Sequence, residues 1–329
     1  MKIAALLPHV EVFGGVRRYI EIGNELVRRG HSFILFHPQG DRPDWLEFRG
    51  MTRPFAALAE EIFDIGMCSE YSILPHFEQL KARAKFFYFV SERHKKEGEV
   101  AAKNYHFLGN SEGICRRMER KYKVNCFKAP GGVNLGIFYP IENRPPHETF
   151  NILCFGRIYK RAKGVKYIIR AADRLYKKYR HLRLIFFDTQ VGRDRRDPRP
   201  LIKTSVPFDF HLNPPQERMA WLFSQADVFV SAELRAGWSN TSAEAMACRI
   251  PVICTKKGTR GFAVHGQTAL VVPLPIPCLL RRQIEKLIRD PNLRERLGRA
   301  GFQKIQGFTW SALADLLLDI FTRVLSEDE

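Results

Sequence analysis

The sequence predicts an α/β fold built from two domains. Short apolar segments typical of buried strands alternate with longer segments of helical period along the 329 residues, which is the pattern of parallel sheets covered by helices. Near the middle, a loop rich in glycine and proline (residues 130–140) and a polar segment (residues 142–148) interrupt this alternation. We therefore expect two α/β halves of similar size, with a cleft between them where a ligand could bind.

The first half opens with a strand, a helix and a second strand. Residues 2–7 have the pattern of a buried strand, a helical pattern then runs from the Gly14-Gly15 turn to Gly30, and residues 32–37 follow as a strand. The turn lacks the G-x-G-x-x-G spacing and no acidic residue ends the second strand, so we expect no dinucleotide site. Gly15 would let a ligand approach the backbone closely, although a plain tight turn explains it almost as well.

The rest of the first half continues the alternation. Strands are expected at residues 64–68, 85–90, 105–110 and 125–129, and a helix at residues 112–123. A polar loop containing Glu92 and His94 follows the strand at residues 85–90, at the strand end where open parallel sheets place ligand groups. A histidine in a surface loop is usually only solvated, so both interpretations of His94 stay open.

The second half contains a similar series of strands. They are expected at residues 150–155, 182–187, 206–211, 228–231, 251–255 and 269–272. Near the end of the chain, Thr309 is a natural N-cap for a helix that needs a partner surface. The apolar residues on one face of this helix are Trp310, Leu313, Leu317, Ile320, Phe321 and Val324.

Two segments of the second half contain the chemically suggestive residues. Arg157 follows the strand at residues 150–155, and Lys163 precedes a helix expected at residues 165–178. Two cations beside a helix N-terminus suit a diphosphate, because arginine can fork to its oxygens and lysine adds a point charge. Loose pairs of basic residues are nevertheless common on protein surfaces.

The other segment, residues 226–255, has the pattern of a strand, a loop, a helix at residues 242–248 and a strand. Its loop contains Gly237 and a Ser-Asn-Thr cluster, so several backbone N–H groups can converge there on an anion. Glu244 would stay ionised in the first helical turn and could accept hydrogen bonds from the vicinal hydroxyls of a ribose. An ordinary βαβ unit with a glutamate near the helix start explains the same pattern.

The net charge of +18 is concentrated in the second half. Residues 1–143 contain 21 Lys and Arg against 17 Asp and Glu, whereas the remainder contains 32 against 18 and carries a net +14. A phosphorylated small molecule, an anionic membrane surface or nucleic acid could use this field. Most aromatic residues lie in expected strands rather than among the basic residues, so nucleic acid is not expected as a partner.

The sequence contains neither a run of 18 apolar residues nor a cleavable signal, so we expect a cytoplasmic protein. Peripheral contact with the inner face of the membrane through the basic residues 116–123 is an alternative to a plain solvated helix face. The seven cysteines are scattered without a C-x-x-C pair and are expected to be reduced.

Several segments in order resemble the retaining glycosyltransferases of family 4, which have the GT-B fold. They are Gly15 after the first strand, GVNLGIFYP, FGRIYKRAKG, SAELRAGWSNTSAEAMACRIPV and PNLRERLG with FTW after it. The resemblance implies two Rossmann-like domains, residues 1–143 and 149–308, facing each other across a cleft, and a final helix (residues 309–329) that returns to the first. It further implies transfer of a sugar from a nucleotide-diphosphate donor to a glycan, lipid-linked or small-molecule acceptor with retention of configuration, as in cell-envelope polysaccharide biosynthesis. No cofactor or metal is implied, and the sequence lacks D-x-D.

Family roles can be assigned residue by residue. Arg157 and Lys163 match the pair that binds the donor diphosphate and stabilises the leaving nucleotide, and Glu244 matches the glutamate that holds the ribose. His94 resembles a first-domain histidine near the reacting sugar, and Gly15 matches the glycine that approaches the donor phosphate. The remaining expected donor-binding residues are Glu233, Gly237, Trp238, Asn240 and Thr241.

The sequence departs from the family pattern at two places. Ala236 stands where most members have a glutamate that contacts the donor sugar, and Glu233 is the candidate to replace it. The alternative is a nucleotide-sugar-binding protein of the same fold with little turnover. The strand end at residues 186–188 also lacks the usual G-x-G, so the geometry of the loop after it is in doubt.

Overall fold

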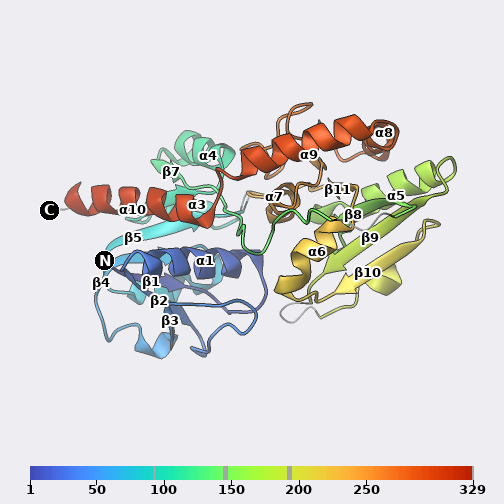
Figure 1. Cartoon of the computed structure of the whole chain (residues 1–329). Coiled ribbons are helices and arrows are strands. Elements are labelled where there is room, and N and C mark those ends of the chain that lie inside the picture. The colour runs from blue at the N-terminus through green and yellow to red at the C-terminus, as the bar shows by residue number, and fades with distance from the viewer. Residues whose placement is uncertain (92–93, 144–146, 191–194, 328–329) are drawn as a thin grey trace. The chain divides into compact units, whose positions relative to one another are not determined.

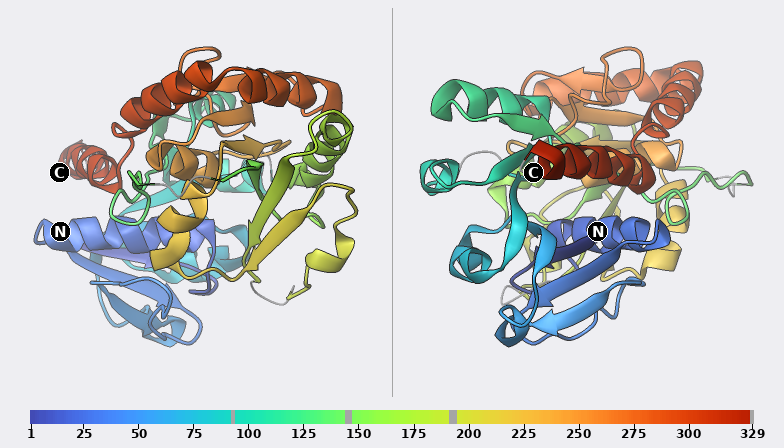
Figure 2. Two further views of the ribbon diagram at one scale, coloured as in Figure 1. Left: turned by 45° about the vertical axis from the view of Figure 1, so that its right-hand side comes forward. Right: turned by 90° about the vertical axis from the view of Figure 1, so that its left-hand side faces the viewer.

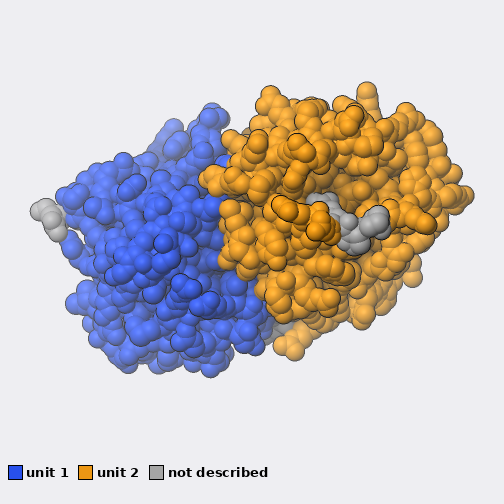
Figure 3. Space-filling model, viewed as in Figure 1, with its two compact units in different colours: residues 1–132, 308–329 blue, residues 133–307 orange. Residues whose placement is uncertain are grey.

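The computed structural model describes residues 1–91, 94–143, 147–190 and 195–327. The chain forms two compact units, one from Met1–Gly132 with Phe308–Glu329 and the other from Val133–Gly307 (Figure 3). Each unit is a parallel sheet covered by helices (Figure 1), which confirms the predicted α/β class with two Rossmann-like domains. Residues 133–143, which the sequence groups with the first half, belong to the second unit, where Phe138 packs on Phe223 with ring centroids 5.8 Å apart.

The sheet of the first unit has seven parallel strands in the order β3-β2-β1-β4-β5-β6-β7. The strands are β1 (Lys2–Leu6), β2 (Ser32–His37), β3 (Met51–Pro54), β4 (Phe63–Cys68), β5 (Ala82–Phe89), β6 (His106–Gly109) and β7 (Cys126–Lys128). The α-helices are α1 (Gly14–Arg28), α2 (Leu74–Gln79), α3 (Glu97–Ala101), α4 (Glu112–Tyr122) and α10 (Trp310–Glu327). The central strand β1 pairs with both neighbours, so that Ile3 lies between Phe33 and Ile65.

Strand β1 shows how this sheet separates two cores. Ile3 and Ala5 pack with residues of α1 and α10, whereas Ala4 and Leu6 point to the other face. Helix α10 lies beside α1 (Figure 2), although the two are distant in sequence. The hydroxyl of Thr309 accepts a hydrogen bond from the Ala312 N–H at 3.1 Å, as expected for the predicted N-cap.

The sheet of the second unit has six parallel strands in the order β10-β9-β8-β11-β12-β13. The strands are β8 (Phe150–Phe155), β9 (Leu182–Asp188), β10 (Phe208–Leu212), β11 (Val228–Ser231), β12 (Val252–Thr255) and β13 (Leu270–Val272). The α-helices are α5 (Val165–Tyr176), α6 (Met219–Ser224), α7 (Asn240–Ala247), α8 (Pro277–Arg289) and α9 (Pro291–Ile305). Because the strands are parallel, the carboxyl ends of β8, β9, β11 and β12 lie along one edge of the sheet.

The core of the second unit is formed by sheet residues such as Ile152 and Leu184 together with apolar residues of α5 and α8. Among the helices in the described ranges, none combines the length and apolarity needed to cross a bilayer. The arrangement places the loops after β8, β9, β11 and β12 next to one another. Five of the ten expected site residues lie in these loops, and three more lie in α7, which follows the loop after β11.

Candidate functional site

Arg157 lies just after β8 and is fixed by the end of the neighbouring strand β9. Its Nε and a terminal nitrogen lie 3.0 and 2.8 Å from Oδ1 of Asp188, and the terminal nitrogen also donates to the Thr189 carbonyl at 2.6 Å. The Arg157 side chain is 11% exposed and that of Asp188 only 1%. The guanidinium is therefore held by groups from two strands before any ligand arrives.

Asp188 is a buried carboxylate that is itself held in place beside Arg157. Burial raises the pKa of its carboxyl, against the opposing effect of the Arg157 charge. Oδ1 accepts the Thr189 N–H at 2.7 Å, while Oδ2 is buried and has no hydrogen-bond partner among the described residues. Sequence reasoning missed this residue, although it noted that the strand ends in Asp188 instead of the family glycines.

Lys163 forms an ion pair with Glu233, whose loop follows β11. The Glu233 side chain is 6% exposed and that of Lys163 is 34% exposed, so the ammonium group reaches solvent and the carboxylate does not. Oε1 of Glu233 faces Lys163, whereas Oε2 is buried without a hydrogen-bond partner in the described part of the chain. Glu233, the candidate sugar contact, thus holds the lysine in this structure.

The two ion pairs meet at the ring of Phe155, the last residue of β8. The guanidinium carbon of Arg157 lies 5.0 Å from the ring centroid and the Lys163 ammonium 5.5 Å from it, distances at which a cation is attracted by an aromatic ring. We call Arg157, Lys163, Asp188 and Glu233 the charged cluster. Its formal charges sum to zero. Because each cation is paired with a carboxylate, an incoming anion would meet two cations that are already oriented.

The loop after β8 is bound tightly to the loop after β11. The Leu234 N–H donates to the Ala162 carbonyl at 2.8 Å. Gly164 has φ +68°, and a Cβ built there would lie 2.0 Å from the carbonyl oxygen of Ala232. Only glycine permits this approach, and Gly164 directly follows Lys163.

The N-terminus of α7 completes the edge. The helix begins at Asn240, two residues before the expected start, so Asn240 and Thr241 lie in its first turn. Ser239 precedes it, with its N–H bonded to the Gly258 carbonyl at 2.9 Å and its hydroxyl bonded to Ser242 at 2.9 Å. The first N–H groups of any helix lack carbonyl partners within the helix and are suited to an anion.

A small pocket at this edge is lined by Lys163, Glu233 and Thr241, together with Phe155 and Ser231. The structure therefore brings these three expected site residues together. Glu244 is a buried residue of α7 with 9% exposure. Gly237 and Trp238 lie in the preceding loop, where Trp238 packs on Phe262 with ring centroids 4.9 Å apart.

The two remaining expected residues, Gly15 and His94, belong to the first unit. Gly15 is the second residue of α1 rather than part of a separate turn, and a Cβ there would meet nothing closer than 3.6 Å. His94 is exposed. Its ring stacks on Tyr71 at a centroid distance of 3.8 Å, and its Nδ1 accepts the Lys96 N–H at 3.2 Å. Glu92 lies outside the described residues.

Comparison with known proteins identifies relatives of this architecture. The family model described as Glycosyl transferases group 1 matches residues 139–304. A D-inositol 3-phosphate glycosyltransferase from Pseudarthrobacter chlorophenolicus is 31% identical over 207 residues, 59% of this chain and 49% of that protein. The capsular polysaccharide biosynthesis glycosyltransferase CapM from Staphylococcus aureus is 28% identical over 224 residues, 64% of this chain and 58% of CapM. The chain spans about half the length of the curated relatives it matches.

Solved structures share the fold over nearly the whole chain. A sucrose-phosphate synthase from Thermosynechococcus elongatus superposes with a TM-score of 0.81 at 19% identity, covering 99% of this chain and 100% of that one. The Anabaena protein HepE, solved in complex with UDP and glucose, gives a TM-score of 0.75 at 14% identity and covers 98% and 99% of the two chains. These similarities confirm the predicted GT-B fold.

Proposed function

The chain belongs to the glycosyl transferases group 1 family, and from this premise we propose that it transfers a sugar from a nucleotide-diphosphate donor to an acceptor. The observation that carries the proposal is that Arg157 and Lys163 both lie at the ring of Phe155, which lines one pocket with Lys163 and with Thr241 of the first turn of α7. The acceptor class we propose is a glycan, a lipid-linked saccharide or a small molecule. The CapM relative, named for capsular polysaccharide biosynthesis, supports a glycan.

The proposed roles follow from where charge develops. Breaking the bond between the sugar and the diphosphate adds negative charge to the leaving oxygen, and oriented cations stabilise that charge most effectively where water is scarce. Arg157 is already oriented by Asp188 and Thr189, so little reorganisation is needed. Lys163 would exchange its contact with Glu233 for the diphosphate, and Glu244 would accept hydrogen bonds from the ribose.

Retention of configuration and independence from metal are parts of this proposal. The acceptor hydroxyl would attack the face from which the nucleotide leaves, and the leaving diphosphate would take its proton. The bond from the sugar to the diphosphate breaks as the bond to the acceptor oxygen forms, so no covalent enzyme intermediate is required. The two cations of the charged cluster supply the charge that a metal ion supplies in other transferases.

The test uses purified protein and a panel of nucleotide sugars. Donors are first selected by thermal shift, and transfer and donor hydrolysis are then measured in buffer with EDTA. We expect Arg157→Ala and Lys163→Ala each to lower kcat/KM for the donor more than tenfold, because each removes a charge-assisted contact to the diphosphate. Arg174→Ala, which removes an exposed cation from α5, is the matched control. Unchanged kinetics in both site variants would show that the assignment is wrong.

A second candidate function is binding of a nucleotide sugar with little turnover. Two observations favour it. Ala236 stands at the position of the family glutamate, and Glu233 is already paired with Lys163. A thermal shift with a nucleotide sugar but neither transfer nor hydrolysis would support this function. Measurable transfer to any acceptor would exclude it.

A further inference from the structure

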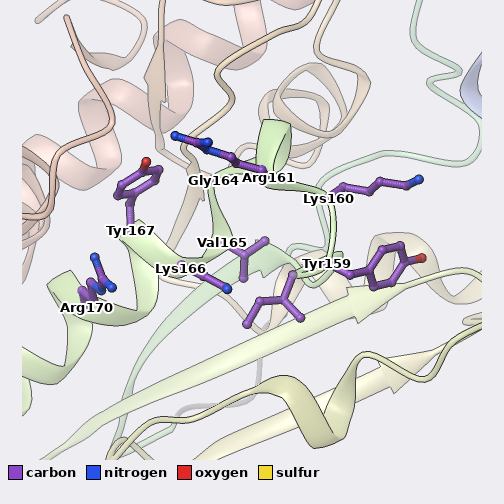
Figure 4. A pocket seen from close by; sticks show the side chains of 9 residues that line it. Tyr159, Lys160, Arg161, Gly164, Val165, Lys166, Tyr167 and Arg170 are labelled. Carbon is purple, nitrogen blue, oxygen red and sulfur yellow. The ribbon is translucent and has the colours of Figure 1, made fainter.

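A second cavity in the second unit is lined by none of the residues of the charged cluster. It has a volume of about 310 Å³, which is within the usual size of small-ligand sites. Its walls come from the segment after β8 and from the first turns of α5, and its lining includes Tyr159, Lys160, Arg161, Lys166, Tyr167 and Arg170 (Figure 4). No acidic residue lines it.

Three cations at this cavity have no carboxylate partner in the described part of the chain, as is also true of other exposed cations of this unit such as Arg174 and Lys177. The three are Arg161, Lys166 and Arg170. By contrast, Lys178 and Arg289 share Glu285, and Arg249 and Arg299 share Glu295. Lys166 and Arg170 are one turn apart on α5, a like-charge spacing that destabilises a helix. An anion bound between them would relieve this repulsion.

Two tyrosines line the cavity, and Figure 4 shows them on opposite sides of the α5 N-terminus. Figure 4 shows Arg161 extending to the same side of the α5 N-terminus as Tyr167, with Arg170 one turn further along the helix. The Tyr159 ring is contacted by a further cation, since the guanidinium carbon of Arg196 lies 5.2 Å from its centroid. Tyrosine offers both a flat apolar face and a hydroxyl, which suits a ring that carries its own hydroxyl groups.

We propose that this cavity is a second ligand site, separate from the donor site, which binds a saccharide carrying more than one phosphate group. The cations bind the phosphates, and Tyr167, which lies on the same side as Arg161, contacts the sugar. A cavity of this size favours a small ligand over a membrane surface or a nucleic-acid duplex, which would contact a broad face. The proposal does not depend on the chain being a transferase. The lining of this cavity includes Gly164, the residue after Lys163. A ligand bound in the cavity can therefore also affect the charged cluster.

The experiment measures binding of glucose 1,6-bisphosphate to the full-length protein by isothermal titration calorimetry. Two further probes are used: pyrophosphate, which lacks the sugar, and glucose, which lacks the charge. We expect the bisphosphate to bind at least tenfold more tightly than pyrophosphate, and glucose to give no measurable heat. Equal binding of pyrophosphate and the bisphosphate would overturn the assignment of a saccharide site.

Three variants locate the binding. The triple variant Arg161→Ala/Lys166→Ala/Arg170→Ala should lose at least tenfold in affinity for the bisphosphate. The charge-matched control Arg174→Ala/Lys177→Ala/Arg281→Ala removes three exposed cations outside the cavity and should change the affinity less than twofold. An equal loss in the control would mean diffuse attraction by the basic surface, as for nucleic acid, and would overturn the proposal.

The third variant, Arg157→Ala/Lys163→Ala, separates this site from the donor site. It should keep the affinity for the bisphosphate, whereas the cavity variant should keep the thermal shift caused by a nucleotide sugar. If the bisphosphate is lost only with the charged cluster, it occupies the donor site and no second site exists. Should the triple variant fail to fold, the single variants Lys166→Gln and Arg170→Gln at exposed helix positions replace it, each with an expected loss of at least threefold.

Discussion

The buried side chain of Asp188 orients Arg157, so a single residue outside the expected site affects its chemistry. Replacing Asp188 with alanine leaves the Arg157 Nε without its acceptor, so the guanidinium can rotate away from the diphosphate. We expect Asp188→Ala to lower kcat/KM for the donor about tenfold, the scale of one charge-assisted hydrogen bond. Asp188→Asn should recover much of this loss, because its amide oxygen can still accept from Arg157. Equal losses in the two variants would show that charge, rather than position, is what Asp188 supplies.

The same residue gives a dependence of stability on pH. Burial raises the pKa of Asp188 above 3.8 in the folded protein, so between 3.8 and the folded value the folded state binds more protons than the unfolded state. The contribution of Asp188 to stability is therefore fully present below pH 3.8 and is lost as pH rises through the folded pKa. Urea unfolding at a series of pH values should show the Asn variant gaining stability relative to the wild type across this window. A relative loss instead would mean that Arg157 lowers the pKa.

Glu233 and Ala236 test how the donor sugar is held. If Glu233 replaces the family glutamate or keeps Lys163 in place, Glu233→Ala should cost about 2 kcal/mol or more of transition-state stabilisation, whereas a solvated glutamate would cost almost nothing. We expect Ala236→Glu to lower turnover, because a carboxylate added in the loop that contains Gly237 and Trp238 would lack a partner. Steady-state kinetics with the best donor measures both. A clear gain of activity in Ala236→Glu would mean that the site is merely degenerate.

The placement of part of the candidate site could be predicted from the sequence for a physical reason. Arg157, Lys163 and Thr241 follow strand ends or begin helices, and parallel topology alone collects such positions at one edge. Asp188 was missed because its role depends on a contact with Arg157, 31 residues away in sequence. The ion pair of Glu233 with Lys163 was missed for the same reason, since spacing along a chain does not specify which side chains meet.

Among the connections between elements, residues 156–164 join β8 to α5, and Lys163 lies directly before Gly164 in this connection. An alanine at Gly164 would take φ +68° and would also collide with the Ala232 carbonyl. We expect Gly164→Ala to lower the free energy of unfolding by about 3 kcal/mol or more and to raise the donor KM. Chemical denaturation and donor kinetics measure the two effects.

Gly266→Ala is the matched control for this prediction. Gly266 has φ +75° in the same unit, and a Cβ there would meet nothing within 4 Å. It should lose only the cost of the left-handed conformation, about 1–2 kcal/mol, and should bind the donor normally. If both variants behave alike, the close approach to Ala232 has no consequence of its own.

Elements with strong apolar patterns were predicted closely, and weak patterns were not. β2 and β8 have the predicted bounds because each is a short buried run. β3 (Met51–Pro54) was not expected, since this edge strand is half-exposed and ends in proline. Helix α7 begins two residues before its predicted start, because Asn240 and Thr241 are weak helix formers that the loop fixes through Ser239.

In the whole molecule, the final helix α10 completes the core of the first unit. Seven residues of α10 are buried in the core of that unit, namely Trp310, Leu313, Ala314, Leu317, Ile320, Phe321 and Val324. Arg29 at the end of α1 also bonds to the Ser311 carbonyl at 3.0 Å and to Asp315 at 2.8 Å. The sequence showed that this helix needs a partner surface, but an apolar face by itself does not identify the surface that it covers.

Removing the helix should therefore unfold one unit and spare the other. Burial of these side chains contributes on the order of 10 kcal/mol, which is comparable to the whole stability of a domain. In a chain truncated after Gly307, we expect the amides of β1, β2, β4 and β5 to lose protection from hydrogen exchange. The amides of β8, β9 and β11 should keep theirs, because the core of the second unit contains no residue of α10. A chain truncated after Ser326, which removes only the exposed end of the helix and the residues after it, is the control and should exchange like the wild type. Protection retained throughout the first unit after the longer truncation would mean that its sheet is stable without α10, and that the apolar face of α1 does not need this cover.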